Sequence, residues 1–183
     1  MKRSIAFLVL ALAAILPSCI PSLHPLYSED KLVFREEIIG EWKNSEETWS
    51  FSKGDGKYYE LVFSDKDEQS EFKAHLVRLG DHYFFDFYNT KNRCTDDDGM
   101  AIAPMLATHS FAKVVFGQND MKLYFFDIEW LEKLFEQRKI RIKHEVMEED
   151  IIVLTAPTAE LQEFVRKYAE EEQAFLSPTH ITR

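Results

Sequence analysis

The sequence has few basic residues and few cysteines, and each shortage narrows what the protein can be. Its 183 residues include 22 Lys and Arg against 32 Asp and Glu, a formal net charge of -10. This balance argues against nucleic acid as a partner, because phosphate binding needs clustered Lys and Arg. It also argues against purely electrostatic docking on an anionic membrane. With only 2 Cys, the chain has little material for disulfide bonds.

Catalytic and cofactor signatures are also missing from the sequence. It contains no G-x-S-x-G, no P-loop, no G-x-G-x-x-G and no H-E-x-x-H pattern. No cofactor is expected, and an enzyme is the third choice among the functional classes. The hydrophobic fraction of 45% and the aromatic fraction of 14% are enough for a packed core. The length fits one domain.

The N-terminal sequence is typical of an export signal. Lys2 and Arg3 precede an unbroken apolar run over residues 5–16. A membrane-spanning helix needs about 20 such residues, so the run fits the apolar region of a signal peptide better than a span.

Leu16, Pro17, Ser18 and Cys19 follow that run and resemble the lipobox of bacterial lipoproteins. The resemblance implies cleavage between Ser18 and Cys19 and a thioether-linked lipid on the Cys19 thiol, with acyl chains such as palmitate. It places the protein in the cell envelope, at the periplasmic face of the outer membrane if the cell is Gram-negative. An ordinary secretory signal with Cys19 as a plain thiol, and an uncleaved anchor, are the alternatives.

Cys94 has no partner within the chain if Cys19 is acylated. The fold then cannot depend on an internal disulfide, and Cys94 is either an incidental thiol or a site of intermolecular bridging.

The chain divides into four parts. Residues 1–18 are the signal peptide, and 19–35 the lipidated N-terminus and a tether, in which Pro21 and Pro25 disfavour regular structure. Residues 36–178 form a single globular domain, and 179–183 a tail.

Short aromatic-rich segments separated by turn residues predict a β-rich α+β domain. We expect strands near 40–44, 47–53, 57–64, 70–79, 82–88, 106–117, 121–127, 141–147 and 150–155. Gly54-Asp55-Gly56, Gly80-Asp81 and Asn119-Asp120 supply hairpin turns, so an antiparallel meander forming a barrel or strongly curved sheet follows. A short helix near 129–138, with Asp127 as its N-cap, and a C-terminal helix near 158–175 complete the fold.

Two further resemblances concern the mature chain. Gly40-Glu41-Trp42 resembles the G-x-W signature of lipocalins, in which the Trp closes one end of an eight-stranded barrel that holds an apolar ligand. Their T-D-Y motif has no counterpart here, since 95–97 is expected in a loop. The layout also resembles a loose group of small bacterial envelope lipoproteins without an assigned activity, through Cys19, residues 25–27, 38–42, 74–76 and 160–162.

Metal sites have weak support in the sequence. Asp96-Asp97-Asp98-Gly99 lacks the acids that an EF-hand would need at Cys94 and Met105, which favours a solvated acidic loop. The six histidines show no local zinc spacing. His75 and His82 could meet across the Gly80 turn, and His109 could join them if the sheet closes suitably.

Glu60 and Asp86 interrupt apolar runs. Alternation favours an outward direction for both; pointing inward, each would need a partner such as Lys73 or Arg78. The aromatic residues are either a tightly packed core or the lining of a ligand cavity; they are Trp42, Trp49, Phe51, Tyr59, Phe63, Phe72, Tyr83, Phe85, Phe87, Phe111 and Phe125.

Taken together, these features predict a membrane-anchored envelope lipoprotein with a non-catalytic binding or structural domain. Its ligand would be an apolar small molecule or lipid held in the barrel. The alternative is a scaffold or assembly component that binds another envelope protein through an exposed aromatic patch.

Overall fold

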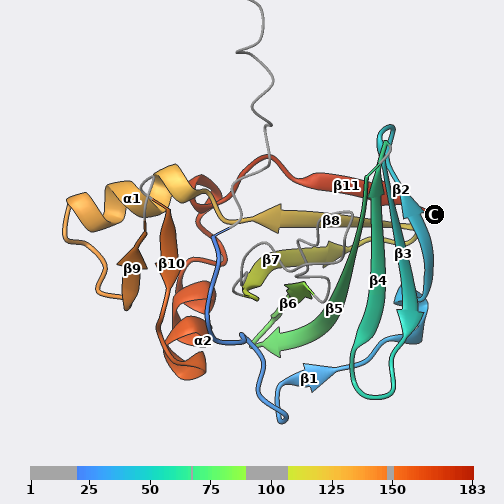
Figure 1. Cartoon of the computed structure of the whole chain (residues 1–183), viewed down its shortest axis with the longest axis horizontal. Helices are drawn as coiled ribbons and strands as arrows, with labels where there is room; N and C mark the ends of the chain where they lie inside the picture. The colour runs from blue at the N-terminus through green and yellow to red at the C-terminus, as the bar shows by residue number, and fades with distance from the viewer. Residues whose placement is uncertain (1–19, 67, 90–106, 148–150) are drawn as a thin grey trace, which may run out of the picture.

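A computed structural model of the chain describes residues 20–66, 68–89, 107–147 and 151–183 (Figure 1). Its centre is a closed, eight-stranded antiparallel barrel in the order β5-β4-β3-β2-β11-β8-β7-β6, with β6 paired back to β5. The barrel strands are β2 (Gly40–Lys43), β3 (Glu47–Lys53), β4 (Tyr59–Asp65), β5 (Glu68–Leu79), β6 (His82–Asn89), β7 (His109–Phe116), β8 (Asp120–Phe125) and β11 (Thr179–Thr182). The β-rich α+β barrel predicted from the hairpin pattern is confirmed.

The hairpin turns form where the glycines predicted them. Gly80 has a φ of +66° between β5 and β6, a conformation that residues with a Cβ rarely adopt. The hairpin that it allows is the longest in the barrel and aligns His75 with Asp86. Gly40 has a φ of +130° at the start of β2, where the chain leaves the 3-10 helix η1 (Glu36–Ile38).

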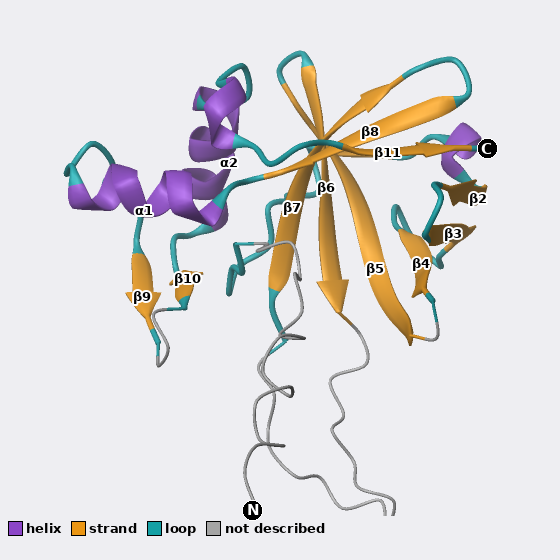
Figure 2. Ribbon diagram, turned by 90° about the horizontal axis from the view of Figure 1, so that it is seen from above, coloured by secondary structure: helices purple, strands orange, loops and turns teal. Residues whose placement is uncertain are grey.

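Two helices and a small ribbon cover one side of the barrel. Helix α1 (Ile128–Glu136) begins at Asp127, whose side chain accepts a hydrogen bond from the backbone N–H of Glu129 at 2.9 Å, so the predicted N-cap is confirmed. Helix α2 (Thr158–Lys167) and the antiparallel pair β9 (His144–Val146) and β10 (Ile152–Leu154) lie on the same side of the barrel strands as α1 (Figure 2).

The second helix is shorter than the predicted 158–175. It ends at Lys167, and a 3-10 helix η3 (Glu172–Ala174) follows. The chain turns there because Phe175 packs on Phe126, with ring centroids 4.6 Å apart.

The expected tail is a barrel strand. Residues 179–182 form β11, which pairs with β8 over four positions and with β2 through Thr182 and Lys43. This strand closes the barrel, and its Ile181 is fully buried.

The expected tether is also part of the folded domain. Ile20, Ser22 and Leu26 are 5%, 0% and 0% exposed. The segment 20–27 runs between α2 and the barrel wall (Figure 1), and its prolines prevent a regular strand without preventing close packing. A short strand β1 (Leu32–Val33) then pairs with β5.

Candidate functional site

The barrel interior is packed with apolar side chains. Inward positions on all eight strands form one buried cluster that includes Trp42, Trp49, Phe51, Tyr59 and Phe85. Neighbouring rings lie close, for example Phe51 and Phe85 at 5.6 Å and Phe85 and Phe87 at 5.4 Å. All the aromatic residues that the sequence singled out belong to this interior except Phe111, which faces the outer layer.

Trp42 and Arg183 meet at one end of the barrel. The indole N–H of Trp42 donates to the Ile38 carbonyl at 2.8 Å, and the Arg183 guanidinium lies 4.8 Å from the centre of the Trp42 ring system. Arg183 also donates to the carbonyls of Glu37 and Ile39 at 2.5 and 2.8 Å. A hollow of about 70 Å³ remains beside them, room for little more than a water molecule or two.

Asp86 is the centre of a buried polar cluster on the outer wall of the barrel. Its side chain points away from the interior, as alternation predicted, yet it has no exposed surface. Its carboxylate accepts hydrogen bonds from the Leu26 backbone N–H at 2.6 Å and from Nδ1 of His109 at 2.7 Å. The partners weighed from the sequence are elsewhere: Arg78 donates to the Gly80 carbonyl, and the Lys73 ammonium lies over the Tyr58 ring.

His75 and Tyr27 extend this cluster. Their rings stack at 4.0 Å, and Nδ1 of His75 has no hydrogen-bond partner among the described residues. Burial lowers the pKa of His75 below its usual 6.5, although the nearby Asp86 carboxylate opposes the shift. Burial, reinforced by Asp86, raises the pKa of the Tyr27 phenol.

The same cluster holds the N-terminal segment in place. Thr158 and Gln162 of α2 donate to the carbonyls of Pro25 and Leu26, each at 2.8 Å, while Asp86 takes the Leu26 N–H from the other side. His109 is 8% exposed and Asp86 is 0% exposed, so the hydrogen bond between them is largely shielded from water. The role of the pair in this arrangement is to fasten residues 20–27 to the barrel.

The predicted histidine pair does not form. Leu79, not His75, is opposite His82, and His82 lies 3.3 Å from a Glu170 carboxylate oxygen. His109 does join His75, through Asp86, since β5, β6 and β7 are neighbours. Within the described ranges, no group of three or more His, Cys, Asp or Glu side chains could hold a metal ion. Glu60 alternates with the inward Tyr59 and Leu61 and points outward.

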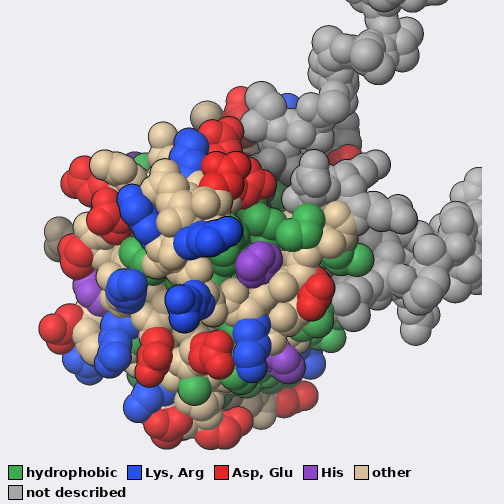
Figure 3. All heavy atoms as spheres, turned by 90° about the vertical axis from the view of Figure 1, so that its left-hand side faces the viewer, with side chains coloured by type: hydrophobic (Ala, Val, Ile, Leu, Met, Phe, Trp, Pro, Cys, Tyr) green, Lys and Arg blue, Asp and Glu red, His purple; other side chains and the backbone are tan. Residues whose placement is uncertain are grey.

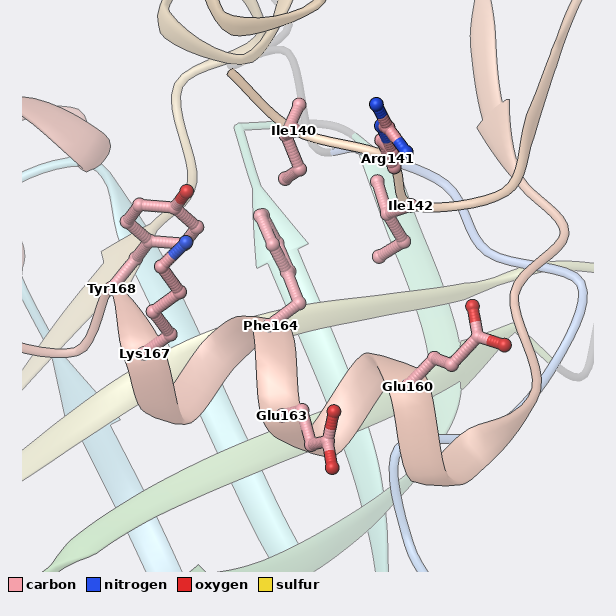
Figure 4. A pocket seen from close by; sticks show the side chains of 8 residues that line it. All are labelled: Ile140, Arg141, Ile142, Glu160, Glu163, Phe164, Lys167 and Tyr168. Carbon is pink, nitrogen blue, oxygen red and sulfur yellow. The ribbon is translucent and has the colours of Figure 1, made fainter. Parts of the chain in front are cut away.

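A groove lies on the helical side of the molecule (Figure 4). It measures about 200 Å³ and lies between the segment after α1 and one face of α2. Ile140, Ile142 and Phe164 point into it from opposite sides (Figure 4). Charged and polar residues complete its wall: Arg141, Glu160, Glu163, Lys167 and Tyr168.

The groove is suited to a side chain more than to a whole small molecule. Its volume falls below the roughly 300–1,000 Å³ of typical ligand pockets. Its apolar floor would take one or two apolar groups, and its rim offers charges of both signs, with Lys167 and Tyr168 in contact at 4.8 Å. Sequence reasoning missed this groove because a strand was expected over 141–147, and only the fold brings residues 140–142 onto α2.

Several predicted sites lie outside the described residues. Ser18, Cys19, Cys94 and the acidic loop 96–98 belong to this group, so the structure does not bear on lipidation or on the signal peptide. In the described part of the chain no helix combines the length and the apolar character needed to cross a bilayer.

Comparison of the chain with family models, with curated proteins and with solved structures finds no match in any of the three.

Proposed function

We propose that this protein is an exported envelope lipoprotein, anchored by lipid on Cys19, whose domain is a non-catalytic module that binds another envelope protein. The anchoring part rests on the lipobox-like residues 16–19 after an apolar run. The binding part rests chiefly on one observation: the barrel interior is filled with packed rings, while a groove of about 200 Å³ lies outside, on α2.

The groove on α2 supports a protein partner because of its chemistry. An apolar floor of Ile140, Ile142 and Phe164 bordered by both charge signs fits an apolar side chain flanked by charged residues. Interfaces commonly combine such an anchor with a polar rim. Two rim residues, Glu163 and Lys167, are exposed, so their charge can be changed without disturbing the core.

Anchoring is tested by Cys19→Ala in the full-length protein expressed in its own host. We expect the variant to lose its acyl mass and to leave the membrane fraction, because two or more chains are needed for stable attachment. Cys94→Ser is the matched control and should remain acylated and membrane-bound. Unchanged membrane retention of Cys19→Ala would refute the lipoprotein assignment.

Partner binding is tested by photo-crosslinking in intact cells from an unnatural side chain at Arg141, on the groove rim. We expect one dominant protein adduct, which the charge reversals Glu163→Lys and Lys167→Glu weaken. The same probe at Val115, exposed on β7, is the control and should give no such adduct. An equal pattern from both positions would count against the groove as the binding surface.

A second candidate is carriage of an apolar small molecule or lipid, favoured by the closed eight-stranded barrel and its resemblance at Gly40-Glu41-Trp42 to lipocalins. Native mass spectrometry of residues 20–183 purified gently from the host distinguishes the two candidates. A reproducible extra mass of a few hundred daltons would favour the carrier, and a bare monomer the protein-binding module.

A further inference from the structure

Strand β9 is the open edge of a small sheet beside the barrel. Among the described strands it pairs only with β10, and β10 is joined on its other side to the N-terminal segment through Ser22 and Leu154. In both ribbon views β9 is the outer strand of this sheet, with β10 between it and the barrel (Figures 1 and 2). An edge of this kind can take up a further extended chain.

Two residues of β9 direct their backbone groups toward the open edge. The Lys143 carbonyl and the Met147 N–H are hydrogen-bonded on the β10 side, at 2.9 and 2.8 Å. Because these groups alternate in direction along an antiparallel strand, Glu145 also faces β10. His144 and Val146 then direct their N–H and C=O groups outward, where a further strand would find its hydrogen-bond partners.

The side chains along this edge carry opposite charges two residues apart. Lys143 and Glu145 are both exposed, and the ion pair that Lys143 makes within its own chain, with Glu160, is long at 4.0 Å. Charges of one sign on an edge strand would repel a second copy of the strand. Here both signs are present, as they are over the whole side of the molecule that carries α1 and β9 (Figure 3).

We propose that two copies of this chain associate by antiparallel pairing of β9 with β9, centred on His144, so that their two small sheets become one. In this register Lys143 of each copy lies opposite Glu145 of the other. His144 exchanges both backbone hydrogen bonds with His144 of the second copy. Val146, which is 57% exposed in the single chain, gains Ile142 of the second copy as an apolar neighbour.

Charge selects this register over its neighbours. Sliding the second copy to the next pairing in one direction places Glu145 opposite Glu145, and in the other direction it places Lys143 opposite Lys143. Like charges directly opposite each other destabilise a strand pair, whereas opposite charges stabilise it. The His144 ring stacks on Phe135 of its own chain, with ring centroids 3.8 Å apart, which holds it on one face of the sheet and leaves the edge clear.

This association goes beyond the proposed function and rests on neither of its parts. It uses the backbone edge and the charges of β9, and requires neither a lipid on Cys19 nor a partner in the groove on α2. Since β9 is only three residues long, few hydrogen bonds form and the pairing is weak in dilute solution. Covalent trapping is therefore the first test.

Two single-cysteine variants trap the pair. Lys143→Cys and Glu145→Cys, each in full-length protein that also carries Cys94→Ser, are purified separately, mixed and mildly oxidised. In the proposed register positions 143 and 145 lie opposite each other, with Cα atoms about 4.5 Å apart. Identical positions are about 8 Å apart, beyond the roughly 7 Å that a disulfide spans. We expect the 143–145 bridge, identified by mass spectrometry of the joined peptides, to exceed either identical-position bridge at least about five-fold.

The other outcomes of this experiment overturn the proposal. Equal yields of the three bridges would indicate random collision, and a dominant 145–145 or 143–143 bridge would indicate a different register. Absence of all three would show that the edges do not meet. The mixed pair keeps one intact contact between Lys143 and Glu145, so the substitutions themselves do not remove the attraction under test.

Charge reversal tests the same pair without cysteine chemistry. By sedimentation equilibrium, Glu145→Lys should raise the dimer dissociation constant about five-fold or more, because it places two lysines opposite each other at two points. Adding Lys143→Glu to it should restore the wild-type value within about two-fold. Glu68→Lys, the same charge change at an exposed position on β5, is the matched control and should have no effect. Failure of the double variant to recover, or a wild-type protein that stays monomeric at every concentration, would overturn the proposal.

Discussion

The inside of the barrel and the layer that covers its outer wall are both closely packed, but different interactions hold them together. Phe84 and Phe85 are neighbours in sequence, both 0% exposed, and belong to opposite sides. Inside, apolar side chains meet across hairpins formed by consecutive strands. Outside, the cover comes from residues 20–27 and α2, and a buried carboxylate joins residues 60 positions apart. The interior depends on burial, and the outer layer depends also on satisfied polar groups.

The largest expected effect comes from truncating the interior. Phe85→Ala should lower the free energy of unfolding by about 3–5 kcal/mol, as large buried side chains do when they leave a cavity. Denaturant unfolding measures the loss. Phe84→Ala should lower the free energy of unfolding by a similar amount. In this variant the covering layer, residues 20–27 and α2, should detach before the barrel unfolds, which would appear as early hydrogen exchange of the 20–27 amides. Simultaneous loss of both layers in Phe84→Ala would show that the two regions are a single cooperative unit.

Asp86→Ala breaks the outer layer at its polar centre. It leaves the Leu26 N–H and the His109 ring without their acceptor, and we expect a loss of about 2–3 kcal/mol. Limited proteolysis should cut within 20–27 while the barrel survives. The control is Glu60→Ala, an outward acid on β4 without this burial, which should be close to neutral. An uncut N-terminal segment in Asp86→Ala would show that apolar packing alone retains it.

Tyr59→Phe tests a polar contact within the barrel. The Tyr59 hydroxyl accepts from the Arg35 N–H at 2.7 Å and donates to the Arg35 carbonyl at 3.1 Å, so its removal should cost about 1 kcal/mol. Burial raises the pKa of Tyr59 to about 12. The folded state favours the protonated phenol. The phenol therefore contributes its full stabilisation of the fold below pH 10, and this stabilisation is lost as the pH rises from 10 toward 12. Unfolding curves for wild type and Tyr59→Phe should converge over that window, and parallel curves would contradict the assignment.

The smallest effect is a pH dependence confined to the outer layer. His75 has a lowered pKa in the folded state, so below pH 6.5 the unfolded chain binds a proton that the native chain resists, and stability falls with falling pH. His75→Gln should flatten this part of the stability profile. A slope in His75→Gln equal to that of the wild-type protein would assign the dependence to another group.

The sequence predicted the barrel interior better than the layer that covers its outer wall, and the reason is physical. Alternation and turn residues are local signals, and they predicted the hairpins of β3 to β8 and the side from which Phe85 and Asp86 project. Alternation names a face of a sheet, however, and says nothing of what covers it, so the burial of Asp86 beneath Leu26 was missed. The same limit hid β11 and residues 20–27, whose partners are all distant in sequence.

The seam between β2 and β11 has a consequence for the order of folding. It joins residues 139 positions apart, and its ladder is a single aligned pair, Thr182 with Lys43, whereas each hairpin ladder is longer. Closing so long a loop costs chain entropy that few hydrogen bonds repay. The curved sheet from β2 to β8 can therefore assemble first as an open trough, and the final strand fastens it late. By the same reasoning, the seam is the first place where the finished barrel opens.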